Sequence, residues 1–167
     1  MAAVRPERIP PGPGQESVWD YPRPPRVEPV TERVRVLHGT RPVADSTRAL
    51  RVLETSQAPA IYLPPDDVDL SLLTRTTTTS FCEWKGSATY WTLRIGEAES
   101  VDAAWSYEDP TPGFEAIRSH LSFYPARVDE CWIGSERATA HPGGFYGGWI
   151  TSKVVGPFKG GPGTQGW

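Results

Sequence analysis

The chain is poor in cysteine, and this scarcity limits the chemistry that it can support. Its two cysteines, Cys82 and Cys131, lie far apart and in no CxxC pair. A structural zinc site usually needs four Cys or His ligands at short spacings, so we expect no metal centre. In a reducing compartment both side chains are expected to be free thiols. We also expect no cofactor, because the sequence shows no Gly-rich phosphate loop between a strand and a helix.

An excess of positive charge and a long apolar segment are also missing. The net charge is −3 at pH 7, which gives no electrostatic basis for binding nucleic acid. No apolar run approaches the roughly 18 residues that span a bilayer. The first fifteen residues lack the apolar core of a signal peptide. We therefore expect neither a nucleic-acid partner nor a membrane partner, and a cytoplasmic location.

Proline and glycine, by contrast, are abundant and gather at the two ends of the chain. The 167 residues include 18 prolines and 16 glycines, a composition that is often disordered in tails. These tails also carry large aromatic side chains, which are seldom left in water in numbers. We expect ordered arms at residues 1–29 and 142–167, laid over a single domain at 30–141 or over the partner subunit of a homodimer. The alternative is a flexible tail, and the sequence leaves monomer and homodimer open.

The middle of the chain has the alternating pattern of β-strands. Val34 and Val36 alternate with Arg33 and Arg35, and Trp91 and Leu93 alternate with neighbours on the opposite face. Turn residues separate several such segments, and only short stretches have helix-start signals. We therefore predict a mainly β fold of two antiparallel sheets in an open sandwich, with one or two short helices. The expected strands cover residues 33–39, 43–46, 48–55, 74–84, 87–95, 101–109, 120–125 and 128–140.

Five motifs occur in an order and spacing that resemble one bacterial family. They are "VADS" with "RAL", "PAIYLPPDDV", "CEWKGSATYW", "DAAWSYEDP" and "HLSFYP". Together, over roughly residues 30 to 128, they resemble domain-of-unknown-function family 427, and the Gly-rich C-terminal segment resembles the extension of a longer subgroup.

The resemblance implies a β-tent, in which two antiparallel sheets are pinned at one edge and splayed around a ligand cleft. Methionine sulfoxide reductase B and the thalidomide-binding domain of cereblon share that fold. Many tent proteins hold a zinc ion with four cysteines, a set that this sequence lacks. The family has no settled biochemical function, so the resemblance implies a shape and a cleft but no reaction.

The stretch "SFCEWKGSATYW" contains the chemically versatile side chains Cys82, Glu83 and Lys85. A nucleophilic cysteine needs a base or a positive neighbour, which Lys85 or His120 could provide. A free cysteine is also a common apolar filler. Glu83 and Lys85 lie on one face of a strand, either as a general base and an anion-binding group or as a solvated pair of little energetic value. His120 is either a pocket residue or a hydrogen-bonded structural residue.

Aromatic side chains are the stronger indication of a site. Aromatic walls with a few polar groups are typical of small-molecule pockets, although a Trp-rich β core would have the same composition. The "HPGGFYGGW" segment could close over such a cleft as a lid or pack across a dimer interface. The residues expected to bind a ligand are Trp84, Lys85, Tyr90, Trp105, Tyr107, His120, Tyr124, Tyr146 and Trp149.

Three functional hypotheses follow from these patterns. The first is a domain that binds a small molecule of unknown identity in an aromatic cleft between two sheets. The second is an enzyme that uses the same cleft, with Glu83, Lys85 or His120 in acid–base roles and Cys82 as a nucleophile. The third is a protein-interaction module whose aromatic arms dock on a partner.

Overall fold

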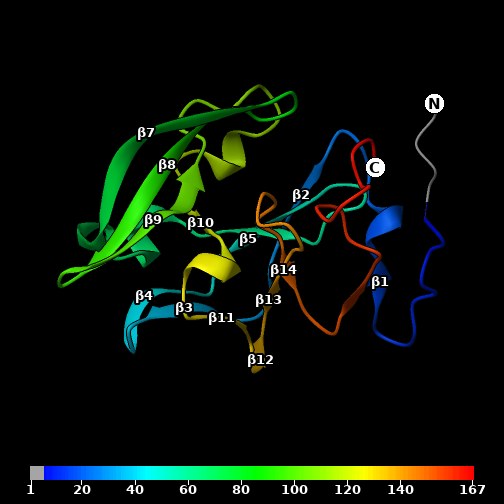
Figure 1. Ribbon diagram of the computed structural model, residues 1–167, viewed down its shortest axis with the longest axis horizontal. Coiled ribbons are helices and arrows are strands. Elements are labelled where there is room, and N and C mark those ends of the chain that lie inside the picture. The colour runs from blue at the N-terminus through cyan, green and yellow to red at the C-terminus, as the bar shows by residue number, and fades with distance from the viewer. Residues whose placement is uncertain (1–5) are drawn as a thin grey trace.

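The computed structural model describes residues 6–167 and confirms a mainly β fold (Figure 1). Two four-stranded antiparallel sheets form its main layers, consistent with a β-sandwich. Three smaller sheets accompany them, which the sequence analysis did not predict as separate units. The long β7–β8 hairpin lies at one end of the molecule, and β1 and the C-terminus lie at the other (Figure 1).

The first sheet has the strand order β10-β9-β8-β7, which leaves β7 at an edge. Its Thr-rich sequence is mostly exposed, as is usual for one face of an edge strand. A register shift between Arg75 and Thr79 is held by Asp102, whose carboxylate accepts hydrogen bonds from the Thr76 and Thr78 hydroxyls at 2.8 and 2.7 Å. The strand bounds are Leu73–Cys82 (β7), Gly86–Ile95 (β8), Ala98–Ser106 (β9) and Ser122–Phe123 (β10).

The second sheet has the order β12-β11-β3-β4 and contains the hairpins β3–β4 and β11–β12. Val34 and Val36 of β3 are fully buried, whereas Arg33 and Arg35, which alternate with them, are not. The alternation was therefore interpreted correctly. Gly134 turns the β11–β12 hairpin at a positive φ of 58°. The bounds are Val34–His38 (β3), Arg41–Ser46 (β4), Glu130–Ile133 (β11) and Glu136–Arg137 (β12).

The third sheet, in the order β2-β5-β6, joins the first through a bridge between Leu63 and Leu121. Two short ribbons involve the ends of the chain: β1 pairs in parallel with β15, and β13 pairs with β14. The bounds are Arg26–Pro29 (β2), Leu50–Leu53 (β5), Ala60–Tyr62 (β6), Glu16–Ser17 (β1), Val154–Val155 (β15), Thr139–Ala140 (β13) and Trp149–Ile150 (β14).

Helical structure in residues 6–167 consists of five 3₁₀ turns of three residues each. The two segments with helix-start signals, residues 64–73 and 110–120, form three of these short turns. Prolines and acidic residues start a helix well, but each turn ends within a few residues and no α-helix follows. The bounds are Val18–Asp20 (η1), Pro65–Asp67 (η2), Leu70–Leu72 (η3), Glu115–Ile117 (η4) and Pro125–Arg127 (η5).

Buried side chains form three clusters. The main cluster lies between the two large sheets and contains Val34, Leu93, Phe123 and Trp149. An aromatic cluster lies on the other face of β8 and β9, where Tyr90 and Trp105 project. The third holds the arms against Leu53, and consists of Val18, Tyr21 and Val154 with Trp19, Ile150 and Phe158 packed on it.

The segments expected to be terminal arms contribute strands to the fold. Residues 26–29, which the sequence analysis assigned to the first arm, form β2 in the third sheet. Beyond them, Trp19 Nε1 donates to the Pro157 carbonyl at 2.9 Å, and the Trp19 and Trp167 rings meet edge to face at 5.5 Å. The arms therefore contact each other as well as the sheets. Within residues 6–167, no helix is long and apolar enough to cross a membrane.

Candidate functional site

A cavity of about 420 Å³ lies where the tip of the β7–β8 hairpin, the third sheet and the C-terminal arm meet. We call it the aromatic cavity. It is lined by Glu54, Gln57, Ala60, Tyr62, Ser80, Phe81, Cys82, Glu83, Trp84, Lys85, Tyr90, Trp105, Tyr107, Tyr124, Phe145, Tyr146, Gly147, Gly148 and Lys159.

Four interlocked rings make the floor of this cavity. Trp105 packs edge to face on Tyr62, with 6.1 Å between ring centroids, and tilts over Tyr124 at 4.6 Å. Its Nε1 donates a hydrogen bond to the Tyr62 hydroxyl at 3.1 Å. Tyr107 lies 6.4 Å from Tyr62. Each of these residues is less than 10% exposed, so the floor is rigid and presents ring faces and edges rather than mobile chains.

Tyrosine hydroxyls supply most of the hydrogen-bonding capacity of the floor. Burial raises the pKa of Tyr62, Tyr107 and Tyr124 far above the ordinary value, so all three stay protonated near neutrality. The Tyr90 hydroxyl shares a hydrogen bond of 2.9 Å with Ser80. No hydrogen bond among residues 6–167 involves the Tyr107 hydroxyl, which leaves its donor and acceptor free for a bound molecule.

The hairpin tip carries Lys85 into the cavity. Gly86 pairs with Cys82 and adopts a φ of +103°, a conformation that other residues rarely take. The neighbouring loop braces the tip, because the Thr111 amide donates to the Lys85 carbonyl at 3.1 Å and the Thr111 hydroxyl donates to the Trp84 carbonyl. The Lys85 ammonium lies 5.7 Å from the Tyr107 ring centroid and 3.9 Å from a Glu54 oxygen.

The C-terminal arm forms the opposite wall, and its glycines permit the close approach. A Cβ on Gly147 would lie 2.1 Å from the Trp105 ring, and one on Gly148 would lie 2.2 Å from the Ala58 carbonyl oxygen. His141 fixes the arm: the Ala58 amide donates to its Nε2 at 2.8 Å, so its Nδ1 donates to the Lys159 carbonyl at 2.7 Å. Lys159 Nζ stands 5.3 Å from the Tyr146 ring centroid.

Most of the residues predicted from the sequence come together in the aromatic cavity. Those that line it are Cys82, Glu83, Trp84, Lys85, Tyr90, Trp105, Tyr107, Tyr124 and Tyr146.

Two predicted residues lie elsewhere. His120 precedes the short strand β10, and its Nδ1 meets the Arg118 carbonyl at 3.0 Å, so it takes no part in the cavity and gives Cys82 no base there. Trp149 is 1% exposed in the main core and donates to the Phe123 carbonyl at 2.9 Å. The arm's glycines turn it inward to pair with β13, away from the aromatic cavity.

Several lining residues were missed by the sequence analysis. Tyr62 lies in the recognised motif "PAIYLPPDDV", and its aromatic ring in a buried strand was the available signal. Glu54, Gln57 and Lys159 come from loops whose placement depends on tertiary contacts. Phe81 and Phe145 stand at the mouth, where they are 76% and 68% exposed.

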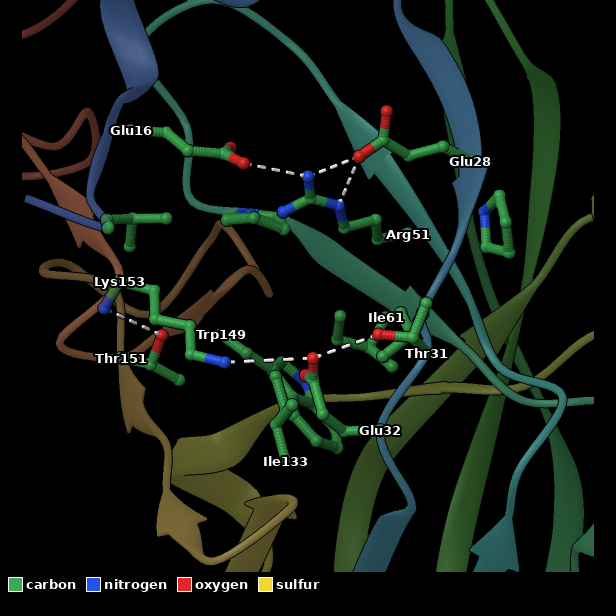
Figure 2. Close-up of a pocket in the computed structure, with 15 residues that line it drawn as sticks. Glu16, Glu28, Thr31, Glu32, Arg51, Ile61, Ile133, Trp149, Thr151 and Lys153 are labelled. Atoms are coloured by element: carbon green, nitrogen blue, oxygen red, sulfur yellow. Dashed lines mark hydrogen bonds and ion pairs between the residues drawn. The ribbon is translucent and has the colours of Figure 1, made fainter.

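A second cavity, of about 300 Å³, lies between the third sheet and both arms (Figure 2). We call it the charged cavity. Arg51 stands between two carboxylates there: its Nε donates to Glu28 at 2.7 Å and its Nη2 donates to Glu16 at 3.0 Å. Lys153 and Glu32 form a looser pair at 3.7 Å across the other side. Trp149 and Ile61 contribute apolar lining.

Possible metal ligands and the two cysteines can be located in the described residues. Between residues 6 and 167, no group of three or more His, Cys, Asp or Glu side chains is arranged to hold a metal ion. Cys131 is 1% exposed, and burial raises the pKa of its thiol, so it serves as an apolar filler. Cys82 is half-buried and lines the aromatic cavity.

The fold and the cavity define a mainly β protein with an aromatic pocket at a sheet edge, closed on one side by its C-terminal arm. The sequence model of a domain of unknown function (DUF427) matches residues 26–134, more than half of the chain, and the protein belongs to this family. No curated protein matches the chain. The cavity floor lies inside the matched segment, whereas the wall formed by residues 145–148 and Lys159 lies beyond it.

Proposed function

We propose that this protein binds a small organic molecule in the aromatic cavity. One observation carries the proposal: a rigid floor of buried rings holds a hydroxyl, on Tyr107, and an ammonium, on Lys85, that form no hydrogen bond within residues 6–167. Neither atom is sealed in the interior: among the described residues, Ser122 Oγ is the fully buried side-chain polar atom without a partner, so the Tyr107 hydroxyl and the Lys85 ammonium are open to the cavity. Polar groups left free at an apolar cavity are what a ligand needs for orientation and specificity.

The size and shape of the cavity support the same proposal. Small-molecule pockets typically measure about 300–1,000 Å³ and are lined mainly by apolar and aromatic groups with a few polar ones. The aromatic cavity, at about 420 Å³, has room for a molecule of one or two rings. Its walls come from segments far apart in the sequence, so the folded chain assembles it as a unit.

A thermal-shift screen of the purified protein against a metabolite library tests the proposal. A ligand at one hundred times its Kd should stabilise the fold by about 2.7 kcal/mol, raising Tm by about 5–11 °C. Trp105→Phe removes the indole N–H that bonds to Tyr62 and should abolish or weaken the shift. Trp132→Phe is the matched control, because Trp132 lies on β11 outside the cavity and bonds to Glu130 instead.

Two results would contradict ligand binding in this cavity. Hits that survive unchanged in Trp105→Phe would place the ligand elsewhere. A complete absence of hits with well-folded protein would favour the interaction module, which the two exposed rings at the mouth, Phe81 and Phe145, would serve.

An enzyme is the second candidate, because Cys82, Glu83 and Lys85 all line the same cavity. Cys82→Ser separates the two functions once a ligand is known. A binding protein should retain its affinity in this variant, whereas a thiol enzyme should keep substrate affinity and lose turnover.

A further inference from the structure

Lys85 lacks the hydrogen bonds that a largely buried ammonium normally has. Its side chain is only 11% exposed. An ammonium has three N–H donors and no acceptor, and these donors are open to the aromatic cavity, because Lys85 Nζ lines it and is not among the fully enclosed atoms of residues 6–167. Within residues 6–167, the nearest opposite charge is Glu54 Oε1 at 3.9 Å, which is beyond hydrogen-bond distance.

Glu54 does not compensate Lys85 fully, because it already has other partners. Its Oε2 accepts a hydrogen bond from Gln57 at 3.0 Å and lies 3.8 Å from Arg23 Nε. The carboxylate is thus shared among three groups. The Lys85 ammonium therefore keeps all three donors free of hydrogen bonds within residues 6–167, and it lies over the Tyr107 ring at 5.7 Å from the ring centroid.

The charges around the cavity limit the ligand further. Lys85 and Lys159 oppose Glu54 and Glu83 among the lining residues, so the lining itself is balanced. Arg23, close to Glu54, adds one positive charge outside it. With Arg23 counted, the charges sum to +1, which a monoanion would neutralise, whereas a dianion such as a phosphate monoester would leave −1 and a cation would leave +2.

We propose that the ligand is an aromatic carboxylate, whose carboxylate accepts hydrogen bonds from Lys85 and whose ring packs on Trp105 and Tyr124. This inference rests on the proposed function, since it names the chemical class that the aromatic cavity takes. A carboxylate offers two acceptor oxygens to the ammonium, and hydrogen bonds between charged groups are about twice as strong as neutral ones. The tilted rings of the floor offer both faces and edges to a flat molecule.

Three probes with one ring system test the carboxylate: indole-3-acetate, indole-3-acetamide and tryptamine. Titration calorimetry on the full chain should show indole-3-acetate binding at least tenfold more tightly than the amide, with tryptamine weakest. Lys85→Met should remove the preference for the acid, and Lys85→Arg, which keeps the charge, should retain it. Lys153→Met is the control, because Lys153 lines the charged cavity; Lys85→Gln replaces the Met variant if that one does not fold.

The remaining outcomes distinguish a failure of the carboxylate inference from a failure of the proposed function. Equal affinity for acid and amide overturns the carboxylate while ligand binding stands, and tightest binding of tryptamine overturns it in favour of a cation. If no indole binds but library hits disappear in Trp105→Phe, the aromatic acid is wrong and the cavity still binds a ligand. If neither the indoles nor the library bind, both proposals fail.

Discussion

Each of the two cavities contains a largely buried cation, but the two cations differ in the hydrogen bonds that they make. In the charged cavity, Arg51 is 23% exposed in its side chain and donates hydrogen bonds to both Glu16 and Glu28 (Figure 2). In the aromatic cavity, Lys85 is 11% exposed and donates none within residues 6–167. The more deeply buried cation therefore has the fewer partners. We interpret Arg51 as a cation that stabilises the fold, whereas the proposed function assigns Lys85 to a ligand.

The carboxylates of the charged cavity also support a stabilising role for Arg51. Burial acts to raise the pKa of Glu16, but hydrogen bonds from Arg51 and Tyr21 outweigh it and hold the pKa below its ordinary value. The Tyr21 hydroxyl donates to Glu16 at 2.7 Å. Glu16 lies on β1 and Arg51 on β5, so the interaction fastens the N-terminal segment to the third sheet. A ligand would have to break these bonds to use the charges.

The largest expected effect comes from Trp149, which joins the C-terminal arm to the main core. Trp149→Ala should lower the free energy of unfolding by about 4 kcal/mol, because it leaves a large void and orphans the Phe123 carbonyl. Urea unfolding measures the change. Phe145→Ala, in the same arm but 68% exposed, is the control and should leave stability nearly unchanged. A loss of unfolding free energy in Trp149→Ala no larger than that in Phe145→Ala would show that Trp149 does not anchor the arm in the main core.

Replacing Arg51 tests the stabilising half of the comparison. Arg51→Met should cost about 2 kcal/mol of unfolding free energy, between the values for exposed and buried ion pairs, because Glu16 and Glu28 each lose a charged partner. The urea midpoint at pH 7 measures this change in the free energy of unfolding. Arg33→Met removes an exposed pair with Asp45 and should not shift the midpoint measurably. Equal midpoints for both variants and the native protein would refute a structural role for Arg51.

His141 makes a smaller, pH-dependent contribution at the wall of the aromatic cavity. Burial lowers its pKa, with the Lys159 carbonyl acting weakly in the opposite direction. The neutral ring accepts from the Ala58 amide, and the protonated ring cannot. Because the folded pKa lies below the unfolded value of about 6.5, this contribution is complete above pH 6.5 and is lost as the pH falls through the folded pKa.

Urea unfolding at pH 7.5 and pH 5.5 should therefore show a loss of stability in the native protein that His141→Gln reduces. Glutamine keeps a carbonyl acceptor for the Ala58 amide but does not titrate in this range. His120→Gln is the control, because the His120 ring hydrogen-bonds to the Arg118 carbonyl at the surface. An identical pH dependence in the His141 variant and the native protein would refute the assignment.

Sequence periodicity predicted most strands of the two large sheets, because these strands depend on local alternation. Leu93 and Tyr90 were placed on opposite faces of one strand, and the structure buries the first in the main core and the second in the aromatic cluster. The same reasoning failed for His120, because β10 is too short to carry the alternation that far. It also failed for Trp149, whose direction depends on positive-φ glycines upstream and on pairing with β13.

The partners of charged groups could not be predicted from the sequence. Arg51 meets Glu16 across 35 residues and Glu28 across 23, and Lys85, in the β7–β8 turn, meets Glu54 in the loop that follows β5. Such contacts follow from how the sheets and arms pack, which no local pattern encodes. The sequence singled out Lys85 as a versatile side chain in "SFCEWKGSATYW", but only the structure shows that its ammonium lacks hydrogen bonds within residues 6–167.

The smallest expected change in stability, and the sharpest test of the comparison, comes from Lys85→Met. The substitution removes an ammonium whose burial is poorly compensated, and it leaves Glu54 with Arg23 and Gln57. The lost attraction and the recovered desolvation cost should nearly cancel, so the unfolding free energy should change by less than about 1 kcal/mol. Urea unfolding beside Arg51→Met measures both cations under one condition. A loss as large as that of Arg51→Met would make Lys85 a structural cation and remove the basis for assigning it to a ligand.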